Sequence, residues 1–254
     1  MDGFPATAGS IDVIAHDLVG STNAEALALA AKGERGPLFV AAQRQSAGRG
    51  RRGREWVSQP GNLYTTLLIS DPAPVFVSPQ LCFVAAIALH DAVLDGCAGL
   101  APSRLKLKWP NDLLLDKAKV AGILIEGVGI ADRKIAVAIG FGVNCSHHPS
   151  GMPYPATDFA ATGFPLSPGS LLALLGVRWE QRMREWDRGK GFAATREAWL
   201  LRASGIGEAV EVRLPQQTLS GIFESVNEEG SLLLRRPDGE RIAVAAGDVF
   251  PLSA

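Results

Sequence analysis

Four arginines crowd one short segment of the chain, residues 47–56, which reads AGRGRRGREW. They are Arg49, Arg51, Arg52 and Arg54. Guanidinium groups this close repel one another, and a bound polyanion would relieve that repulsion. Arginine also pairs with phosphate oxygens through two parallel hydrogen bonds. The segment therefore favours a phosphate-binding loop, although a solvated surface loop stays open as an alternative.

The glycines of this segment match the spacing of a dinucleotide-binding fingerprint, G-x-G-x-x-G. That fingerprint requires a helix directly after the loop, so that the helix N-terminus meets the pyrophosphate. Here Pro60 and Gly61 indicate a turn, and residues 62–70 have the composition of a strand. The strand–loop–strand setting disfavours a dinucleotide fold. A single copy between two strands also disfavours an arginine–glycine nucleic-acid arm, which usually lies in a repetitive disordered tail.

A second candidate motif begins in residues 104–109, RLKLKW. Polar and apolar residues alternate there, which predicts a strand with Lys106 and Lys108 on one face. Pro110 ends the strand, and Asn111 and Asp112 follow it. On these residues alone, Lys108 could be a solvated lysine and Asp112 part of a simple turn.

The elements that must position these residues predict a mixed sheet with flanking helices. The expected helices are 21–33, 79–96, 167–189 and 191–204, and the expected strands are 11–19, 37–43, 62–70, 104–109, 112–116, 119–128 and 134–144. Short polar turns join the last of these strands, so part of the sheet must be antiparallel. Thr22 and Glu25 fit a capping box at the first helix, and Ser78 fits an N-cap before Pro79.

From about Gly205 the pattern changes to short strands separated by turn sequences such as NEEG and PDGE. This predicts a small β-barrel or sandwich of roughly 50 residues, near the lower limit for an independent fold.

The composition is that of a globular protein, with 47% hydrophobic and 20% charged residues. A formal net charge of −1 gives no global attraction to nucleic acid or to an anionic membrane. Cys82, Cys97 and Cys145 are odd in number and share no C-x-x-C spacing, which indicates a reducing compartment. No secretory signal is visible, and His90 and Asp91 interrupt the longest apolar run before it reaches membrane-spanning length. We expect a soluble, cytoplasmic protein.

Several separated segments together resemble the biotin protein ligase family. They are GSTNAEA at 20–26, QSAGRGRRGREW at 45–56, KWPNDLLL at 108–115, KVAGILIE at 119–126 and GFGVN at 140–144. Their order and spacing are similar to those of the ligase catalytic domain. The resemblance implies an α+β catalytic domain over residues 1–204, a mixed α/β sheet with flanking helices like that of class II aminoacyl-tRNA synthetases. It also implies a small C-terminal SH3-like β-barrel over residues 205–254.

The activity that the resemblance implies is ATP-dependent biotin–protein ligation. Biotin's carboxylate attacks the α-phosphate of ATP with Mg²⁺, giving biotinyl-5′-adenylate and pyrophosphate. A lysine of a biotin carboxyl carrier protein, part of a biotin-dependent carboxylase, then attacks the anhydride and releases AMP. The implied catalytic residues are Lys108, Arg49, Arg51 and Asp112. The carrier, the order of substrate binding and the choice between monomer and homodimer stay open.

The same resemblance implies binding residues for both small molecules. Those for biotin are Ser21, Thr22, Asn23, Gln45, Gly48, Arg49, Arg51, Lys108, Leu113 and Gly122, and those for ATP are Arg54, Trp56, Lys119 and Asn144. Trp56 would stack on adenine, and Asn144 could equally be a structural turn residue. Asp112 could act as a base, as an orienting group or as a Mg²⁺ ligand. The metal ligands are otherwise unknown, and Mg²⁺ is expected with the ATP phosphates.

Two rival functions remain at this point. A lipoate ligase or octanoyltransferase shares the fold, but the full arginine loop and the β-rich tail argue against it. A nucleic-acid-binding module would use the basic loop for salt-sensitive binding. Repressor-type relatives carry a winged-helix domain before the serine–threonine–asparagine motif, which begins here at Ser21. We therefore expect no operator DNA among the partners. The net charge and the interrupted apolar run described above likewise predict no membrane partner.

Overall fold

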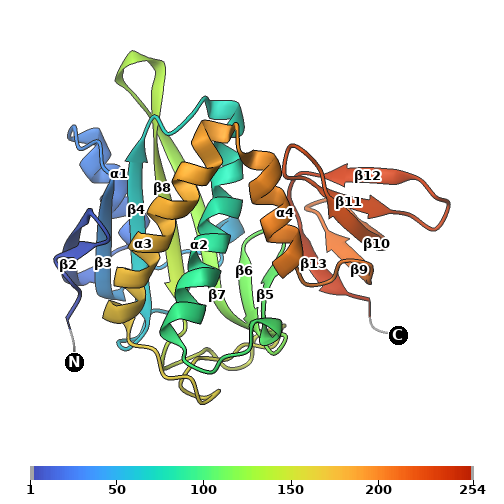
Figure 1. The fold of residues 1–254 in the computed structure, drawn as a ribbon, viewed down its shortest axis with the longest axis horizontal. Coiled ribbons are helices and arrows are strands. Elements are labelled where there is room, and N and C mark those ends of the chain that lie inside the picture. Colours follow the sequence, from blue (N-terminus) through green and yellow to red (C-terminus); the bar gives the residue numbers. More distant parts are fainter. Residues whose placement is uncertain (1–2, 253–254) are drawn as a thin grey trace.

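A computed structural model gives the fold of residues 3–252, without the side chain of Asp132. Its larger sheet has eight strands in the order β1-β2-β3-β4-β8-β7-β6-β5 (Figure 1). The strands are β1 Thr7–Ala8, β2 Ile11–Val19, β3 Leu38–Gln45, β4 Leu63–Ser70, β5 Leu105–Lys108, β6 Asp112–Leu115, β7 Ala118–Ile130 and β8 Lys134–Val143. Only β2 and β3 pair in parallel, and the other neighbours are antiparallel. The expected mixed sheet is confirmed.

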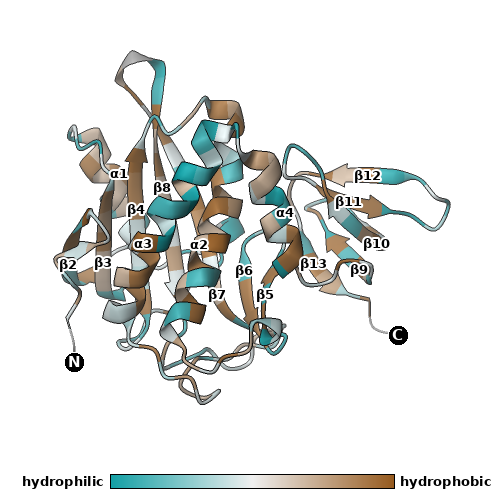
Figure 2. Cartoon of the chain, viewed as in Figure 1, coloured by the Kyte–Doolittle hydropathy of each residue, from teal (hydrophilic) through white to brown (hydrophobic). Residues whose placement is uncertain are grey.

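Helices cover both faces of this sheet. They are α1 Thr22–Ala31, α2 Leu81–Gly96, α3 Pro168–Trp186 and α4 Phe192–Arg202. Alternate residues of β3 belong to different apolar clusters: Phe39 packs in the large core with α2 and α3, and Val40 packs in a small cluster with α1. Because side chains alternate along a strand, this one is buried on both faces. Figure 2 shows the resulting pattern, with apolar strands in the interior and hydrophilic residues along the visible side of α3.

Helix α2 corrects the expectation about apolar runs. The segment Val75–Gly96 is long and apolar enough to cross a membrane by length and composition, so His90 and Asp91 do not shorten it below that limit. However, 72% of its most apolar window is buried inside the fold. The helix contacts α3, α4 and strands of the sheet, so its apolar residues serve the protein core.

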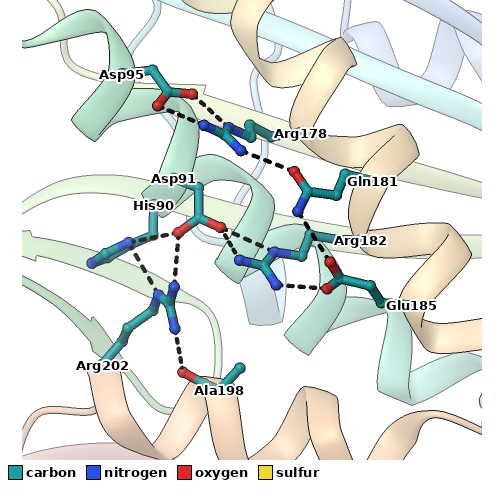
Figure 3. A network of polar contacts seen from close by, with 9 residues as sticks. All are labelled: His90, Asp91, Asp95, Arg178, Gln181, Arg182, Glu185, Ala198 and Arg202. Atoms are coloured by element: carbon teal, nitrogen blue, oxygen red, sulfur yellow. Dashed lines mark hydrogen bonds and ion pairs between the residues drawn. The ribbon is translucent and has the colours of Figure 1, made fainter.

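The two interrupting residues anchor a polar network within the helical layer (Figure 3). Asp91 accepts hydrogen bonds from Arg182 of α3, at 2.5 Å, and from Arg202 of α4, at 3.1 Å. His90 lies 3.3 Å from the same carboxylate. Burial opposes ionisation, but the bond to His90 and the two guanidinium groups hold the pKa of Asp91 well below its ordinary value. One carboxylate therefore ties three helices together.

Two expected helix starts are wrong. Ser21, not Thr22, precedes the first turn of α1, and Glu25 does not complete a capping box, because the Gln45 side chain takes that place. Ser78 lies within a 3₁₀ segment, Val75–Gln80, and its buried hydroxyl has no partner among the described residues. At α1 a hydrogen bond to a distant residue takes the place of the capping box, and at α2 an extra 3₁₀ turn separates Ser78 from the start of the helix.

A second, five-stranded antiparallel sheet follows α4, with strand order β12-β11-β10-β9-β13. Its strands are β9 Ala209–Arg213, β10 Thr218–Val226, β11 Leu232–Arg235, β12 Arg241–Val244 and β13 Asp248–Pro251. Trp109 Nε1 donates to the carbonyl of Gly230, at 3.2 Å. A Cβ added to Gly230 would lie 2.9 Å from the Phe83 ring of α2. This close approach fixes the small sheet beside the end of β5, where the lysine motif lies.

Candidate active site

A cavity of about 420 Å³ opens beside the larger sheet, within the range that small-molecule sites occupy. Four parts of the chain line it: the β2–α1 junction, the arginine loop between β3 and β4, strands β5 to β8 with the loop after β8, and strand β13 of the small sheet. Thirteen of the predicted site residues line this single cavity: Ser21, Thr22, Asn23, Gln45, Arg49, Arg51, Arg54, Trp56, Lys108, Asp112, Lys119, Gly122 and Asn144.

Two predicted residues are not brought to the cavity. Leu113 is 1% exposed and packs in the main core, because its neighbour Asp112 faces the cavity and side chains alternate along β6. The structure therefore does not bring the Leu113 side chain to the cavity wall, and its contact with a ligand stays a prediction. Gly48 lies where the two arms of the arginine loop meet, and an added Cβ there would be 2.5 Å from the carbonyl oxygen of Trp56. Gly48 allows two backbone segments to approach closely, which differs from the predicted ligand contact.

The β2–α1 junction forms one polar wall. The Gln45 side chain accepts from the backbone N–H of Thr22, at 2.9 Å, and from its hydroxyl, at 3.2 Å. The amide nitrogen of Gln45 donates to Ser58, at 3.0 Å. Gln45 is thus held in one orientation at the start of α1, as a flat polar ring of a ligand would require.

Asn23 is hydrogen-bonded entirely within the protein. Its amide oxygen accepts from Thr66, at 2.6 Å, and its nitrogen donates to Glu126, at 2.8 Å, and to the carbonyl of Leu124, at 3.3 Å. Glu126 in turn forms an ion pair with Arg49, at 3.3 Å. The predicted ligand residue Asn23 therefore orients the carboxylate that holds the first loop arginine.

The arginine loop is a compact hairpin without a following helix. The backbone N–H of Trp56 donates to the carbonyl of Gly48, at 2.9 Å, and the backbone N–H of Gly50 donates to the carbonyl of Arg54, at 2.7 Å. A 3₁₀ turn spans Arg51–Gly53, in which Arg52 has a φ of 57°. The strand–loop–strand setting expected from the sequence is confirmed by β3 and β4.

Three loop arginines converge on one carboxylate of the small sheet. Asp248 lies 2.9 Å from Arg54, 3.2 Å from Arg52 and 3.7 Å from Arg51. Arg51 also donates to Asn111 Oδ1, at 3.2 Å. Burial lowers the pKa of the Arg51 guanidinium, and Asp248 opposes that effect. The mutual repulsion expected of these arginines is thus compensated within the protein by a residue from the other sheet.

The two lysines of the site have different surroundings. Lys119 forms an ion pair with Asp112, at 2.6 Å. Among the described residues, no carboxylate lies within 4.0 Å of the Lys108 ammonium, which rests 5.2 Å from the centre of the Phe250 ring. Burial lowers the pKa of Lys108, and Asp112 opposes that effect. Lys108 is the lysine that remains available to an incoming anion.

The Trp56 indole packs closely against a glycine of β7 and a glycine of β8. An added Cβ would lie 2.5 Å from the indole at Gly142 and 3.1 Å from it at Gly122. Lys119 lies 5.5 Å from the centre of the indole and the same distance from the Tyr154 ring. The buried indole N–H has no partner among the described residues. The absence of side chains at these two glycines leaves room for the indole of Trp56.

Asn144 and Asn62 shape the loop after β8. The Asn144 side chain donates to the carbonyl of Thr157, at 3.0 Å. Asn62 accepts backbone N–H groups of Cys145, Ser146 and His147, at 2.9 to 3.1 Å. This hydrogen bond is what a structural role for Asn144 in the loop would require. The residue also lines the cavity, so a role in ligand binding stays open.

Sequence reasoning missed Asp248 and Phe250, which belong to a strand far along the chain, and Glu126, which the quoted KVAGILIE segment contains. The described residues contain no group of three or more His, Cys, Asp or Glu side chains arranged to hold a metal ion. Two carboxylates of the cavity pair with cations, Asp112 with Lys119 and Asp248 with the loop arginines.

Comparison with known proteins places the chain among its relatives. Residues 18–144 match the model of the Biotin/lipoate A/B protein ligase family, and residues 205–250 match that of the Biotin protein ligase C terminal domain. A biotin–[acetyl-CoA-carboxylase] ligase of Paracoccus denitrificans is 42% identical, over 91% of this chain and 96% of the relative. A bifunctional ligase/repressor of Bacillus subtilis is 33% identical, over 89% of this chain and 70% of the relative.

The solved biotin protein ligase of Aquifex aeolicus, in complex with biotin and ATP, gives a TM-score of 0.78 at 25% identity, covering 94% of this chain and 98% of that one. The expected fold class is confirmed: a mixed α/β sheet with flanking helices and an SH3-like C-terminal sheet. The chain belongs to the biotin/lipoate A/B protein ligase family and carries the C-terminal domain of its biotin protein ligases.

Proposed function

We propose that the chain is an ATP-dependent biotin–protein ligase that forms biotinyl-5′-adenylate and transfers the biotinyl group to a lysine of a biotin carboxyl carrier domain. One observation carries the proposal: a single cavity joins an oriented amide, an unpaired lysine, an arginine loop and an aromatic platform. Gln45 and Thr22 suit biotin's ureido ring, which needs both hydrogen-bond donors and acceptors. The 42% identical relative is named for the same activity.

Lys108 is the proposed electrostatic catalyst of the first step. A carboxylate that attacks a polyphosphate brings two anions together, so a cation near both lowers the barrier. The Lys108 side chain is half-buried, and its ammonium is free of carboxylates within 4.0 Å among the described residues, which leaves its three N–H donors for biotin and the α-phosphate. Arg49 and Arg51 of the loop would cover the adenylate and exclude water, which hydrolyses acyl-adenylates.

ATP would bind across the platform and the loop. The adenine would stack on Trp56, and Arg54 and Lys119 would meet the phosphates. Mg²⁺ bound with the triphosphate would supply neutralisation of the phosphate charge. Because Mg²⁺ usually takes one or two protein carboxylates with phosphate and water oxygens, Asp112 fits it once Lys119 turns to the nucleotide.

In the second step, the carrier lysine attacks the carbonyl of the mixed anhydride and AMP leaves. Asp112, at the edge of the cavity, would orient the incoming amine or accept its proton. The carrier is proposed to be that of a biotin-dependent carboxylase, and the site is proposed to act in the cytoplasm.

The proposal is tested by mixing the purified chain with biotin, ATP, Mg²⁺ and a purified carrier domain, and detecting biotinylation by mass spectrometry. We expect one biotinyl group on one carrier lysine, and none with octanoate or lipoate in place of biotin. Transfer of lipoate or octanoate without transfer of biotin would instead identify a lipoate-type enzyme. A mobility-shift assay with duplex DNA tests the expected absence of operator binding.

A further inference from the structure

Phe250 of strand β13 brings an aromatic face to two cations. The centre of its ring lies 5.2 Å from the Lys108 ammonium and 4.3 Å from the Arg213 guanidinium. Phe250 belongs to the small sheet, whereas Lys108 ends β5 of the large sheet, and both residues line the cavity. A ring face attracts a cation through its quadrupole, most strongly where water is excluded.

Lys119 and Lys108 are held in different ways, Lys119 by a carboxylate and Lys108 by the face of an aromatic ring. Lys119 is held by Asp112 at 2.6 Å, so a phosphate oxygen must compete with that carboxylate. The face of a ring fixes the position of an ammonium without accepting a conventional hydrogen bond. A ring beside the Lys108 ammonium therefore leaves the N–H donors of this lysine free for ligand oxygens.

We propose that Phe250 is a positioning residue of the adenylation step, which holds the Lys108 ammonium in the cavity by a cation–π contact from the small C-terminal sheet. This inference rests on the proposed biotin activation. It gives the small sheet a direct part in the chemistry, in addition to the ion pairs that Asp248 makes with the loop.

The charged groups around Lys108 define what the ring must do. Asp112 and Asp248 favour the charged form of this lysine, whereas burial, Lys119 and Arg54 disfavour it. The Phe250 ring also favours the charged form of Lys108, so weakening the attraction between ring and ammonium must lower the pKa of Lys108 further.

The test replaces Phe250 with phenylalanines that carry one, two, three and five ring fluorines. Fluorine withdraws charge from the ring face while changing its size little, so a structural role would not respond in steps. We expect the pKa of the Lys108 side chain, followed by NMR of labelled lysine, to fall stepwise by about one pH unit over the series. The kcat of biotin-dependent ATP–pyrophosphate exchange should fall about five- to tenfold in parallel, with its alkaline limb moving to lower pH.

Matched variants separate this contact from its neighbours. Phe223, which is buried in the same small sheet, receives the same fluorine series and should leave both readouts unchanged. Phe250→Trp should retain exchange, whereas Phe250→Leu should lower its kcat by about the same five- to tenfold as the most fluorinated ring, with equal melting temperatures. Arg213→Leu removes the second cation and should preserve the dependence on fluorine.

The two readouts distinguish this inference from the proposed function. A pKa of Lys108 that is constant across the series would overturn the role of Phe250, whatever the enzyme's activity. A stepwise change of that pKa in a chain that shows no exchange with biotin would support the contact and count against the proposed substrate.

Discussion

Arg54 and Asp248 lie 194 residues apart in the chain, yet Nη2 of the arginine is 2.9 Å from the carboxylate. The contact joins the loop between β3 and β4 to the last strand of the small sheet. Arg52 and Arg51 approach the same carboxylate, at 3.2 and 3.7 Å. One carboxylate therefore offsets part of the positive charge that three neighbouring arginines concentrate in the loop.

Asp248→Asn should raise the KM for ATP about three- to tenfold, because the arginines lose the charge that gathers them and the ion pairs are partly exposed. Steady-state exchange at varied ATP measures this effect. Asp238→Asn, in a turn of the same sheet, is the matched control and should behave as the wild type. An unchanged KM in Asp248→Asn would show that the loop needs no partner from the small sheet.

Gly142→Ala should displace the Trp56 indole, because the added Cβ would lie 2.5 Å from the ring. We expect the KM for ATP to rise about ten- to a hundredfold, as for an overpacked site, with a smaller change for biotin. Gly129→Ala on β7 has nothing within 4 Å of the new atom and should be silent. Equal ATP binding by the two variants would argue against Trp56 as the adenine platform.

Asp91→Asn should lower the free energy of unfolding at neutral pH by about 3 kcal/mol, because the arginines of α3 and α4 lose a buried partner. The pKa of Asp91 is lowered in the fold from 3.8, so its contribution is complete above that pH and is lost as the pH falls through the folded value. Urea unfolding of both proteins should therefore differ at pH 7 and converge in acid.

Asp187→Asn is the control for that comparison. Its ion pair with Lys190 is exposed, so the change should cost less than about 0.5 kcal/mol. A loss in Asp91→Asn no larger than that of Asp187→Asn would contradict the structural importance of the network.

Local sequence patterns predicted the fold well. The alternation in 104–109 gave β5, and the short polar turns gave the antiparallel meander β6–β7–β8. Ser78 missed its capping position because an extra 3₁₀ turn precedes α2, and the other two differences come from partners far along the chain. Gln45, 23 residues away from Thr22, takes over the capping of α1, and burial under two helices explains the unbroken apolar length of α2.

The cavity residues also divide into those within local sequence motifs and those brought in by contacts between distant residues. Motif residues such as Lys108 and Trp56 were found because their neighbours in the chain form a recognisable pattern. Asp248 and Phe250 lie in a short tail without such a pattern. Contacts between distant residues bring that tail to the cavity, among them the hydrogen bond from Trp109 to Gly230 and the ion pairs of Asp248 with the loop. Leu113 belongs to a motif but packs in the core, since membership of a motif does not fix which face of a strand a residue occupies.

The most direct test of the central claim is ATP–pyrophosphate exchange driven by biotin, comparing the wild type with Lys108→Ala and with Lys106→Ala. Lys106 lies on the same strand and face but does not line the cavity, which makes it the matched control. We predict exchange that requires biotin, a loss of at least about a hundredfold in Lys108→Ala, and near wild-type rates in Lys106→Ala. Exchange driven by lipoate and not by biotin, or equal rates in all three proteins, would contradict the account.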